Sequence, residues 1–439
     1  MLQTMTSSIP LVVILVSMLA VIPISLSGKY PNIREGWTFL AGGIKLFLIL
    51  SMLPLVLQGN VIEFVLCQIL PGLAIKLKVD AFGMLFALVA SSLWIVTSMY
   101  SIGYMRGLKE HAQTRFYCFF ALSLGATIGV AFSANLLTLY LFYELLSLST
   151  YPLVTHHQDR EARSGGRTYL TYLLGTSICL ILPAMILTYS ITGTLEFSGS
   201  GVFGDHALGA LMPVLLLMFV FGFAKAGLMP FHSWLPSAMV APTPVSALLH
   251  AVAVVKVGIF CVLRIITGIF GVHLLSYLNL GIVICVIAGI SVVISSLMAL
   301  TQDNLKRRLA FSTIGQLSYI ILGAGLLTYT GLVGSMMHIA MHAFGKITLF
   351  FCAGAIYVAT GKKNVSEMVG IGRRMPFTMF AFLLGALSVI GLPPLGGFFS
   401  KWYLVLGSLE ADKVWVLCIY LISSLLNAAY FLPIVFKAF

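Results

Sequence analysis

Thirteen apolar segments, each about as long as a bilayer is thick, recur along the whole chain and restrict its fold more than any other feature. An α-helix needs about 20 apolar residues to cross the hydrocarbon core. Lipid cannot satisfy free backbone N–H and C=O groups, so such segments must be helices and not open strands. The sequence therefore predicts an all-α polytopic membrane protein with about 13 transmembrane helices, near residues 9–28, 37–57, 80–102, 115–133, 134–155, 167–193, 208–230, 242–268, 273–300, 306–327, 330–358, 376–400 and 413–437.

Composition supports this class. Of the 439 residues, 60% are hydrophobic and only 9% are charged, whereas soluble domains carry about 25% charged residues. The opening MLQTMTSSIP lacks the basic region of a cleavable signal peptide, so we expect the first apolar segment to be a helix of the protein. The longest non-spanning stretch, about 58–79, is expected to lie along the outer surface.

The net charge of +12 reflects topology and not a nucleic-acid partner. With the N-terminus outside, the outer loops hold only Lys76, Lys78 and Lys413. The inner loops hold all the other loop cations: Lys29, Arg34, Arg106, Lys109, Arg115, Arg160, Arg163, Arg167, Lys306, Arg307, Arg308, Lys362, Lys363, Arg373, Arg374 and Lys437. Cytoplasmic loops of membrane proteins are enriched in Lys and Arg. We therefore expect a cytoplasmic (inner) membrane protein, bacterial or archaeal, with its N-terminus outside.

Two spans are interrupted by glycine and proline, at residues 225–234 in the seventh and 391–402 in the twelfth. Proline removes a helical hydrogen bond, so both helices should break inside the membrane. Counting helices divides the chain into a three-helix region, 1–113, and two five-helix groups, 114–268 and 269–439. Five helices reverse the direction of insertion, and broken helices at matching positions of inverted repeats mark the ion path of transporters. The alternative is that Gly and Pro are simply common in membrane helices.

Glu144, in the fifth span, is the one carboxylate clearly inside a predicted helix, and Lys225 precedes the first break. A charge at mid-bilayer costs at least about 2.5–3.5 kcal/mol, so it rarely persists without a partner or a function. We expect the two side chains to approach one another, in a pair that takes part in proton transfer. A purely structural ion pair between two helices is the alternative.

His338, His342 and Lys346 are spaced four residues apart in the eleventh span and therefore lie on one helix face, about 6 Å apart per step. Three titratable groups in a row on an apolar helix favour a proton relay. Hydrogen-bonded core histidines are the first alternative. A two-histidine metal site is the second, and it is disfavoured because no carboxylate on that span supplies a third ligand.

His250 and Lys256 belong to the eighth predicted span. Six helical residues separate them by about 120°, so they should not point along one line. Lys256 is the stronger candidate for an ion path. Lys401 follows the second break, where it would end such a path near the outer side. For Lys401 the alternative is a side chain that extends to the membrane interface.

Other ionisable residues are weaker candidates. Lys45 and Arg264 lie nearer the ends of predicted spans and are expected to extend to the interface. His232 lies two turns beyond the lysine of the first break. His156 and His157 fall in a predicted inner loop, where we expect them to be solvated.

No motif predicts a cofactor or metal site in this chain. The seven cysteines are isolated within apolar segments, without CxxC or Cys/His spacing. No Walker loop, catalytic triad or haem ligand pair is present. The sequence thus indicates neither redox nor hydrolytic chemistry of its own.

Five motifs in order resemble the antiporter-like subunits of respiratory complex I, the Mrp-type cation/proton antiporters and the membrane arms of energy-converting hydrogenases. They are FYEL around Glu144, KAGLMPFHSWLP from Lys225, APTPVSALLH to His250, HIAMHAFGK to Lys346 and GLPPLGGFFSK to Lys401. The resemblance runs from about residue 80 to the end.

The resemblance implies two inverted five-helix bundles with discontinuous seventh and twelfth helices. It further implies that protons pass along a line made by Glu144, Lys225, Lys256, His250, His338, His342, Lys346 and Lys401. Flavin, iron–sulfur clusters or Ni–Fe would sit only in partner subunits. The expected partners are membrane lipids, homologous antiporter-like and other small membrane subunits, and peripheral redox subunits.

Two features depart from the family pattern. Many relatives have an acid and a histidine just after the WLP motif, where this chain has Ser237 and Met239. Relatives also commonly have a fourteenth helix, which is not among the thirteen segments. Three functions stay open: an ion-translocating subunit of a redox-driven complex, a subunit of a stand-alone Na⁺/H⁺ antiporter, and a structural membrane-arm subunit.

Overall fold

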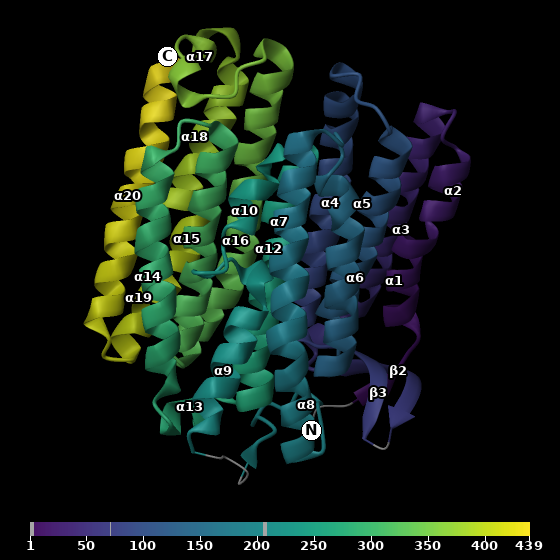
Figure 1. Ribbon diagram of the computed structural model, residues 1–439, viewed down its shortest axis with the longest axis vertical. Coiled ribbons are helices and arrows are strands. Elements are labelled where there is room, and N and C mark those ends of the chain that lie inside the picture. The colour runs from purple at the N-terminus through teal and green to yellow at the C-terminus, as the bar shows by residue number, and fades with distance from the viewer. Residues whose placement is uncertain (1–3, 71, 205–208) are drawn as a thin grey trace.

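The computed structural model describes residues 4–70, 72–204 and 209–439, although the side chains of residues 70 and 249–251 are also outside this description. Most helices stand side by side along the long axis (Figure 1). The helices are α1 Ile9–Leu19, α2 Val21–Leu26, α3 Pro31–Leu57, α4 Ala81–Gly107, α5 Gln113–Ala131, α6 Leu136–Val154, α7 Arg160–Thr176, α8 Leu182–Thr192, α9 Leu211–Gly222, α10 Trp234–Ser237, α11 Thr243–Ala251, α12 Val254–Arg264, α13 Val272–Tyr277, α14 Leu280–Thr301, α15 Leu305–Gly325, α16 Tyr329–Thr360, α17 Ile371–Arg374, α18 Pro376–Ile390, α19 Gly396–Glu410 and α20 Val414–Ala438.

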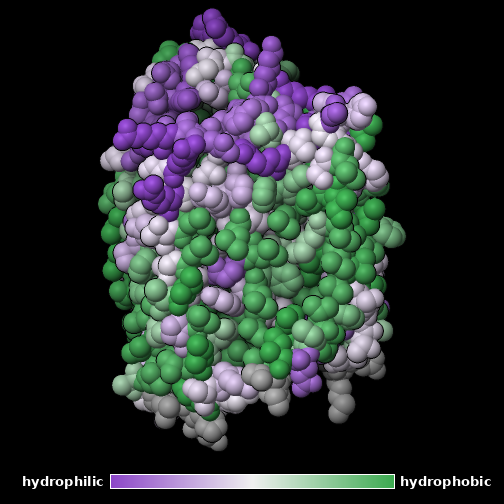
Figure 2. Space-filling model, turned by 45° about the vertical axis from the view of Figure 1, so that its right-hand side comes forward, coloured by the Kyte–Doolittle hydropathy of each residue, from purple (hydrophilic) through white to green (hydrophobic). Residues whose placement is uncertain are grey.

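The all-helical, multi-pass prediction is confirmed. Within the described residues, nine helices are long and apolar enough to cross a membrane, and two shorter ones, α9 and α18, are also apolar. The nine are Ile9–Leu26, Pro31–Leu57, Ala81–Gly107, Gln113–Ala131, Leu136–Val154, Arg160–Thr192, Leu280–Thr301, Tyr329–Thr360 and Val414–Ala438. Figure 2 shows the apolar side chains over the flanks and polar ones gathered at the end where α17 lies.

Both predicted helix breaks are present. In the first of the two broken spans, helix α9 ends at Gly222. The chain then forms a 3₁₀ turn at Ala224–Ala226 and becomes helical again at Trp234. The second ends with α18 at Ile390 and resumes with α19 at Gly396. In each case Gly and Pro occupy the gap, as expected from their poor fit to a helix interior.

A three-stranded sheet was not predicted. β2 (Val61–Leu70) and β3 (Leu73–Val79) form an antiparallel hairpin, and β1 (Thr4–Thr6) pairs with β2 in parallel. The hairpin occupies the stretch expected to lie along the outer surface, at the opposite end of the molecule from the C-terminus (Figure 1). Strand pairing gives these β-branched and apolar residues backbone partners outside the helix bundle.

Polar side chains close the amino ends of five long helices. Asp80, Asn135, Asp159, Asn304 and Thr328 each accept a hydrogen bond from the backbone N–H three residues later. These caps satisfy donors that have no partner inside the helix. The starts of these five helices therefore have a local sequence signal.

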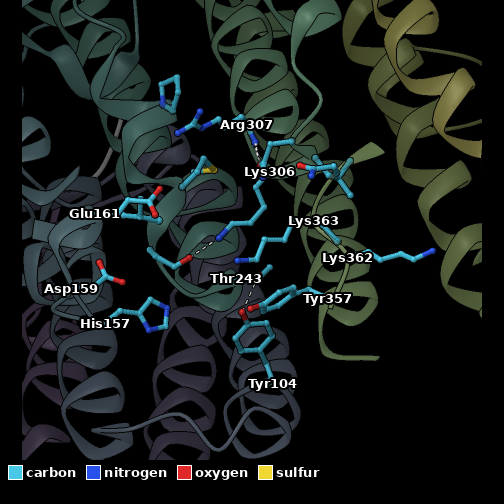
Figure 3. A pocket seen from close by; sticks show the side chains of 18 residues that line it. Tyr104, His157, Asp159, Glu161, Thr243, Lys306, Arg307, Tyr357, Lys362 and Lys363 are labelled. Atoms are coloured by element: carbon cyan, nitrogen blue, oxygen red, sulfur yellow. Dashed lines mark hydrogen bonds between the residues drawn. The ribbon is translucent and has the colours of Figure 1, made fainter. Parts of the chain in front are cut away.

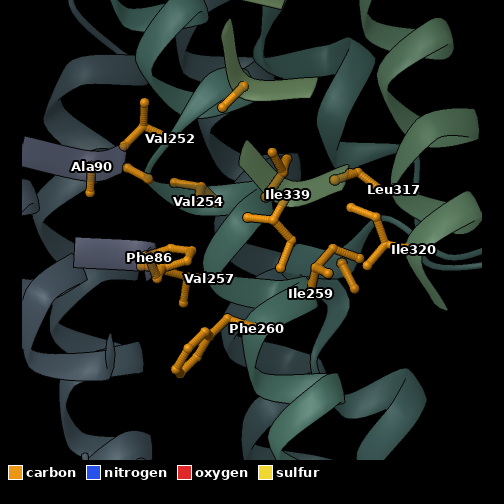
Figure 4. Packing of buried hydrophobic residues seen from close by; sticks show 14 of the residues in the cluster. Phe86, Ala90, Val252, Val254, Val257, Ile259, Phe260, Leu317, Ile320 and Ile339 are labelled. Atoms are coloured by element: carbon orange, nitrogen blue, oxygen red, sulfur yellow. The ribbon is translucent and has the colours of Figure 1, made fainter. Parts of the chain in front are cut away.

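The apolar core at the centre of the molecule is built from elements far apart in the chain. Figure 4 shows Phe86 of α4, Phe260 of α12, Leu317 of α15 and Ile339 of α16 together in this core. Phe260 stacks on Phe82, with ring centroids 4.4 Å apart. This packing holds α12 against α4, and Lys256 of α12 is buried from lipid and water.

Candidate buried ion path

Lys225 lies in the first break and is fully buried. Its Nζ donates to the carbonyl of Tyr143 at 2.5 Å and lies 3.1 Å from the centroid of the same ring. The indole N–H of Trp234 donates to the carbonyl of Ala224 at 2.9 Å. The broken helix therefore uses neighbouring side chains to satisfy its backbone, and the lysine is aimed at α6.

Glu144 is the next residue after Tyr143, so the structure brings Lys225 close to it, but the two do not form a direct ion pair. Neither carboxylate oxygen has a hydrogen-bond partner within contact distance among the described residues. Lys225 and the Ser177 hydroxyl act on the carboxylate from longer range. Ser177 opens a π-helical turn, Ser177–Ile181, an irregularity that often marks functional positions. Glu144 is thus a partly exposed residue whose two carboxylate oxygens are themselves buried and without a partner in the described part of the chain, so the carboxylate can take a proton or a cation.

Among the described side chains of the candidate path, Lys256 and His342 make the closest contact between two titratable groups. Lys256 Nζ lies 2.6 Å from His342 Nδ1, and both side chains are buried. A lysine ammonium can donate to an unprotonated ring nitrogen, or a neutral lysine can accept from a protonated one. Two cations at this distance would repel strongly, so the pair can hold at most one excess proton, which either partner can carry.

His250 lies in α11, but its side chain is outside the described residues. The expectation that it sits about 120° from Lys256 on one helix is wrong, because α11 ends at Ala251 and α12 begins at Val254. No proline lies in this gap. The interruption comes at Val252, whose backbone angles (φ −129°, ψ −60°) leave the helical range.

His338 continues the line from His342 along α16. The two rings have centroids 5.8 Å apart, nearly parallel. His338 Nδ1 is 2.8 Å from Ser400 Oγ, and Nε2 is 2.9 Å from Gln316 Oε1. An amide oxygen only accepts a hydrogen bond, so Nε2 carries a hydrogen toward Gln316, and Nδ1 beside the Ser400 hydroxyl is the nitrogen at which the ring can take up and release a proton.

Lys346 and Lys401 lie at two further positions of the line, and both are buried. Lys346 Nζ donates to Ser312 Oγ at 2.8 Å. Lys401 Nζ donates to the Ile390 carbonyl at the second break, at 3.0 Å, and to Ser424 Oγ at 3.1 Å. Extension of Lys401 to the membrane interface is therefore excluded.

The hydroxyl and amide groups that support these lysines and histidines were not predicted from the sequence. Ser312 also accepts from the Tyr430 hydroxyl at 2.8 Å, and Lys401 Nζ lies 4.7 Å from the centroid of the Tyr319 ring. Gln316 and Ser400 are fully buried. These supporting groups could have been found from polar residues inside apolar spans, as in FSTIGQLSY of α15.

The expectation that Lys45 extends to the interface is wrong. Its side chain is fully buried, donates to the Leu124 carbonyl at 3.2 Å and lies 4.6 Å from the centroid of the Trp94 ring. A ring face and a carbonyl oxygen together attract the ammonium inward. Lys45 is therefore a buried lysine in the opening helices, away from the residues of the line.

The same expectation is wrong for Arg264, which forms a two-pronged ion pair with Asp80. NH1 and NH2 each donate to one carboxylate oxygen at 2.6 Å. One of these oxygens also caps α4 by accepting from the Gly83 N–H at 2.8 Å. A single carboxylate therefore ties α12 to the start of α4.

We expect Arg264→Met to destabilise the protein by about 3 kcal/mol, because it leaves Asp80 without its cation in a largely buried position. Thermal or denaturant unfolding in detergent measures the loss. Arg163→Met, on the exposed side of α7, is the matched control and should change stability by no more than about 0.5 kcal/mol. Equal effects of the two substitutions would refute a structural role for the pair.

His156 and His157 are not both solvated. His156 is fully buried, and burial lowers its pKa to about 3, so the ring is neutral at physiological pH. His157 is half-buried and lines a cavity of about 590 Å³ at the polar end of the molecule. His232 is partly exposed and lies beside the Phe311 ring.

This cavity separates acidic from basic side chains (Figure 3). Asp159 and Glu161 line one side, and Lys306 and Lys363 the other. Lys306 donates to the Ala241 carbonyl at 2.6 Å. The wall includes the first residues of α11 and α15, the helices whose later turns carry the buried polar groups. The cavity therefore gives ions and water a place to collect at that end of the bundle.

Comparison with known proteins identifies what this arrangement is similar to. Residues 133–427 match the family described as NADH:quinone oxidoreductase/Mrp antiporter, TM. NADH-quinone oxidoreductase subunit N of Desulforudis audaxviator (strain MP104C) is 36% identical over 377 residues, which are 84% of this chain and 74% of that protein. Na(+)/H(+) antiporter subunit A1 of Staphylococcus aureus is 32% identical over 400 residues. This match covers 85% of the chain but only 48% of the relative, so the chain spans about half of that longer protein.

Two solved structures share the fold. A chain of the membrane-bound sulfane sulfur reductase, an archaeal respiratory membrane complex, superposes with a TM-score of 0.87 at 24% identity, over 98% of this chain and 88% of that chain. A chain of the Mrp complex from Dietzia sp. DQ12-45-1b gives a TM-score of 0.85 at 23% identity, over 98% and 80% respectively. The arrangement of helices is therefore shared across complexes with different names.

Proposed function

Because the chain belongs to the NADH:quinone oxidoreductase/Mrp antiporter transmembrane family, we propose that it is an ion-translocating membrane subunit whose buried lysines and histidines conduct protons. The observation that carries this proposal is the direct 2.6 Å contact between Lys256 and His342, continued by the stacked ring of His338. Structural ion pairs join opposite charges. This contact joins two bases, which suits the sharing of a proton.

In the proposed path, protons enter from the cavity beside Lys306 and reach the central pair through Lys346 and its hydroxyl partners. From Lys256 and His342 they pass to His338 and leave near Lys401. The groups lie on α12, the last helix of the first group, and on α15, α16 and α19 of the second group, so the path runs from one group into the other. Glu144, Lys225 and His250 would form the corresponding part of the first group.

Several finer features of the architecture belong to the same proposal. We assign thirteen crossings, with α9 to α10, α11 to α12 and α18 to α19 each counted as one interrupted span. The divisions 1–113, 114–268 and 269–439 then separate an opening region from two inverted repeats. The positive end, which carries Arg373 and Arg374 of α17, faces the cytoplasm. The opposite placement of the hairpin and the C-terminus supports an odd number of crossings (Figure 1).

The energy source is proposed from the relatives. Subunit N is named for NADH-quinone oxidoreductase, which favours a complex whose redox cofactors reside in other subunits and whose electron transfer drives this subunit. Subunit A1 is named for Na(+)/H(+) antiport, which favours a second possibility, exchange driven by ion gradients alone. Copurification of a flavin or metal-cluster subunit in mild detergent would distinguish the first from the second.

Glu144→Gln tests the proposal, because it keeps the shape of the side chain and removes the ability to carry a negative charge. We expect proton translocation by the reconstituted complex, followed with a pH-sensitive dye in vesicles, to fall at least tenfold. Assembly should stay intact, since Glu144 makes no direct ion pair in the structure. Unchanged translocation by the assembled variant would instead support a structural subunit.

A further inference from the structure

Four side chains at the polar end of the bundle converge on a single point outside the proposed path. Glu110 and His111 lie in the loop between α4 and α5, and His156 and His157 follow the end of α6. From Glu110 Oε2, His157 Nδ1 is 3.6 Å away, and His111 Nδ1 and His156 Nε2 are each 3.9 Å away. Three imidazoles thus surround one carboxylate oxygen.

These distances are too long for hydrogen bonds but close to those between ligands of one metal ion. In a tetrahedral zinc site with bonds of 2.0–2.2 Å, ligand atoms lie about 3.3–3.5 Å from one another. The ligand atoms of Glu110, His111 and His157 already lie within 4.8 Å of one another. Bringing these three ligand atoms into range would close their widest separations by about 1 Å, a change that side-chain rotation can supply, and His156 Nε2 lies 3.9 Å from the same carboxylate oxygen.

His156 supplies an independent indication of a missing partner. Its side chain is fully buried, and neither ring nitrogen has a hydrogen-bond partner among the described residues. A buried polar group without a partner is costly and calls for an explanation. The Nε2 atom faces the same carboxylate oxygen as the other two rings. The nearby guanidinium of Arg115 donates through NH2 to the main-chain carbonyl of His156, at 2.8 Å, so it leaves the ring nitrogens free.

We propose that Glu110, His111, His156 and His157 bind a divalent transition-metal ion of the zinc type. Imidazole and carboxylate ligands suit zinc and its neighbours in the first transition row, and they do not suit Mg²⁺ or Ca²⁺, which prefer all-oxygen sites. The ion would join the loop before α5 to the loop after α6. It would also fix His157, which lines the cavity at this end of the molecule.

The site is tested with the intact purified protein, stripped with a chelator and titrated with Zn²⁺ alone. We expect one tightly bound ion per chain, with a Kd of about 1 µM or lower, and a melting temperature that rises with zinc concentration. His157→Asn and Glu110→Gln should each weaken binding at least tenfold. His273→Asn, which alters an exposed histidine on α13, should leave binding unchanged.

The melting temperatures of the variants and the wild type are also measured without metal. A variant that melts like the metal-free wild type has kept its fold, so its weaker zinc binding reflects the lost ligand. Co²⁺ in place of zinc should give the visible absorption of a four-coordinate nitrogen–oxygen site, and His157→Asn should diminish it. The proposal is overturned by the absence of a stoichiometric site, or by equal loss of affinity in His157→Asn and His273→Asn. None of these measurements depends on ion translocation.

Discussion

Replacing Lys256 by methionine is expected to reduce proton translocation at least tenfold while the protein still folds and assembles. Methionine fills a similar volume without an amine, so the apolar packing around α12 is kept. The substitution removes one of the two bases that hold the shared proton and leaves His342 Nδ1 without its 2.6 Å partner. A proton that reaches the centre of the line then finds His342 alone, without the second base that shares it.

Lys45→Met is the matched control, since Lys45 is also a fully buried lysine but lies outside the proposed path. Both variants lose one buried ammonium, so they share any general effect on stability. Translocation in vesicles should fall in Lys256→Met and stay near wild type in Lys45→Met. The two variants are compared at equal amounts of assembled protein. If their translocation rates are alike, the loss of any buried lysine explains the effect, and the proposed proton path is wrong.

The helix breaks could be predicted because their cause is local. Gly391 and the prolines that follow it cannot continue a helix, whatever packs around them, and α18 ends one residue before that glycine. The spacing of His338 and His342 on one face of α16 is equally local, since it depends only on helix geometry.

The burial of ionisable side chains near the ends of predicted spans could not be predicted, because it depends on residues distant in the sequence. Lys45 is held by the carbonyl of Leu124 and the ring of Trp94, neither of which a helix-end argument considers. Arg264 finds Asp80 some 184 positions away in the chain. Position near a span end indicates what a lone side chain would do in lipid, whereas the fold supplies partners that lipid lacks.

The interruption between α11 and α12 has no local cause in residue type, so the sequence did not predict it. Val252 and Ala253 contain no helix-breaking residue type, yet the backbone leaves the helix there. Helix α12 approaches the first helix break so closely that only glycine fits at position 258. A Cβ atom at Gly258 would lie 2.1 Å from the Ala226 nitrogen and 2.3 Å from the Lys225 carbonyl carbon.

Gly258→Ala is therefore expected to destabilise the protein by about 3 kcal/mol, at the upper end of the range for overpacked sites. Backbone atoms, and not a flexible side chain, occupy the space that the methyl group needs. To admit it, the 3₁₀ turn must move away from α12 and carry Lys225 with it. Ion translocation should fall along with the melting temperature, because Lys225 would lose its contact with Tyr143.

Gly175→Ala provides the comparison, since a Cβ atom at this α7 glycine meets nothing within 4 Å. Alanine is favoured over glycine in a helix by up to about 1 kcal/mol, so this variant should be as stable as the wild type or more so. Melting temperatures of the two variants in one detergent decide the matter. A Gly258→Ala protein that melts like Gly175→Ala would mean that α12 does not approach the broken helix this closely, and Lys225 would then lack the rigid support that a fixed position in an ion path requires.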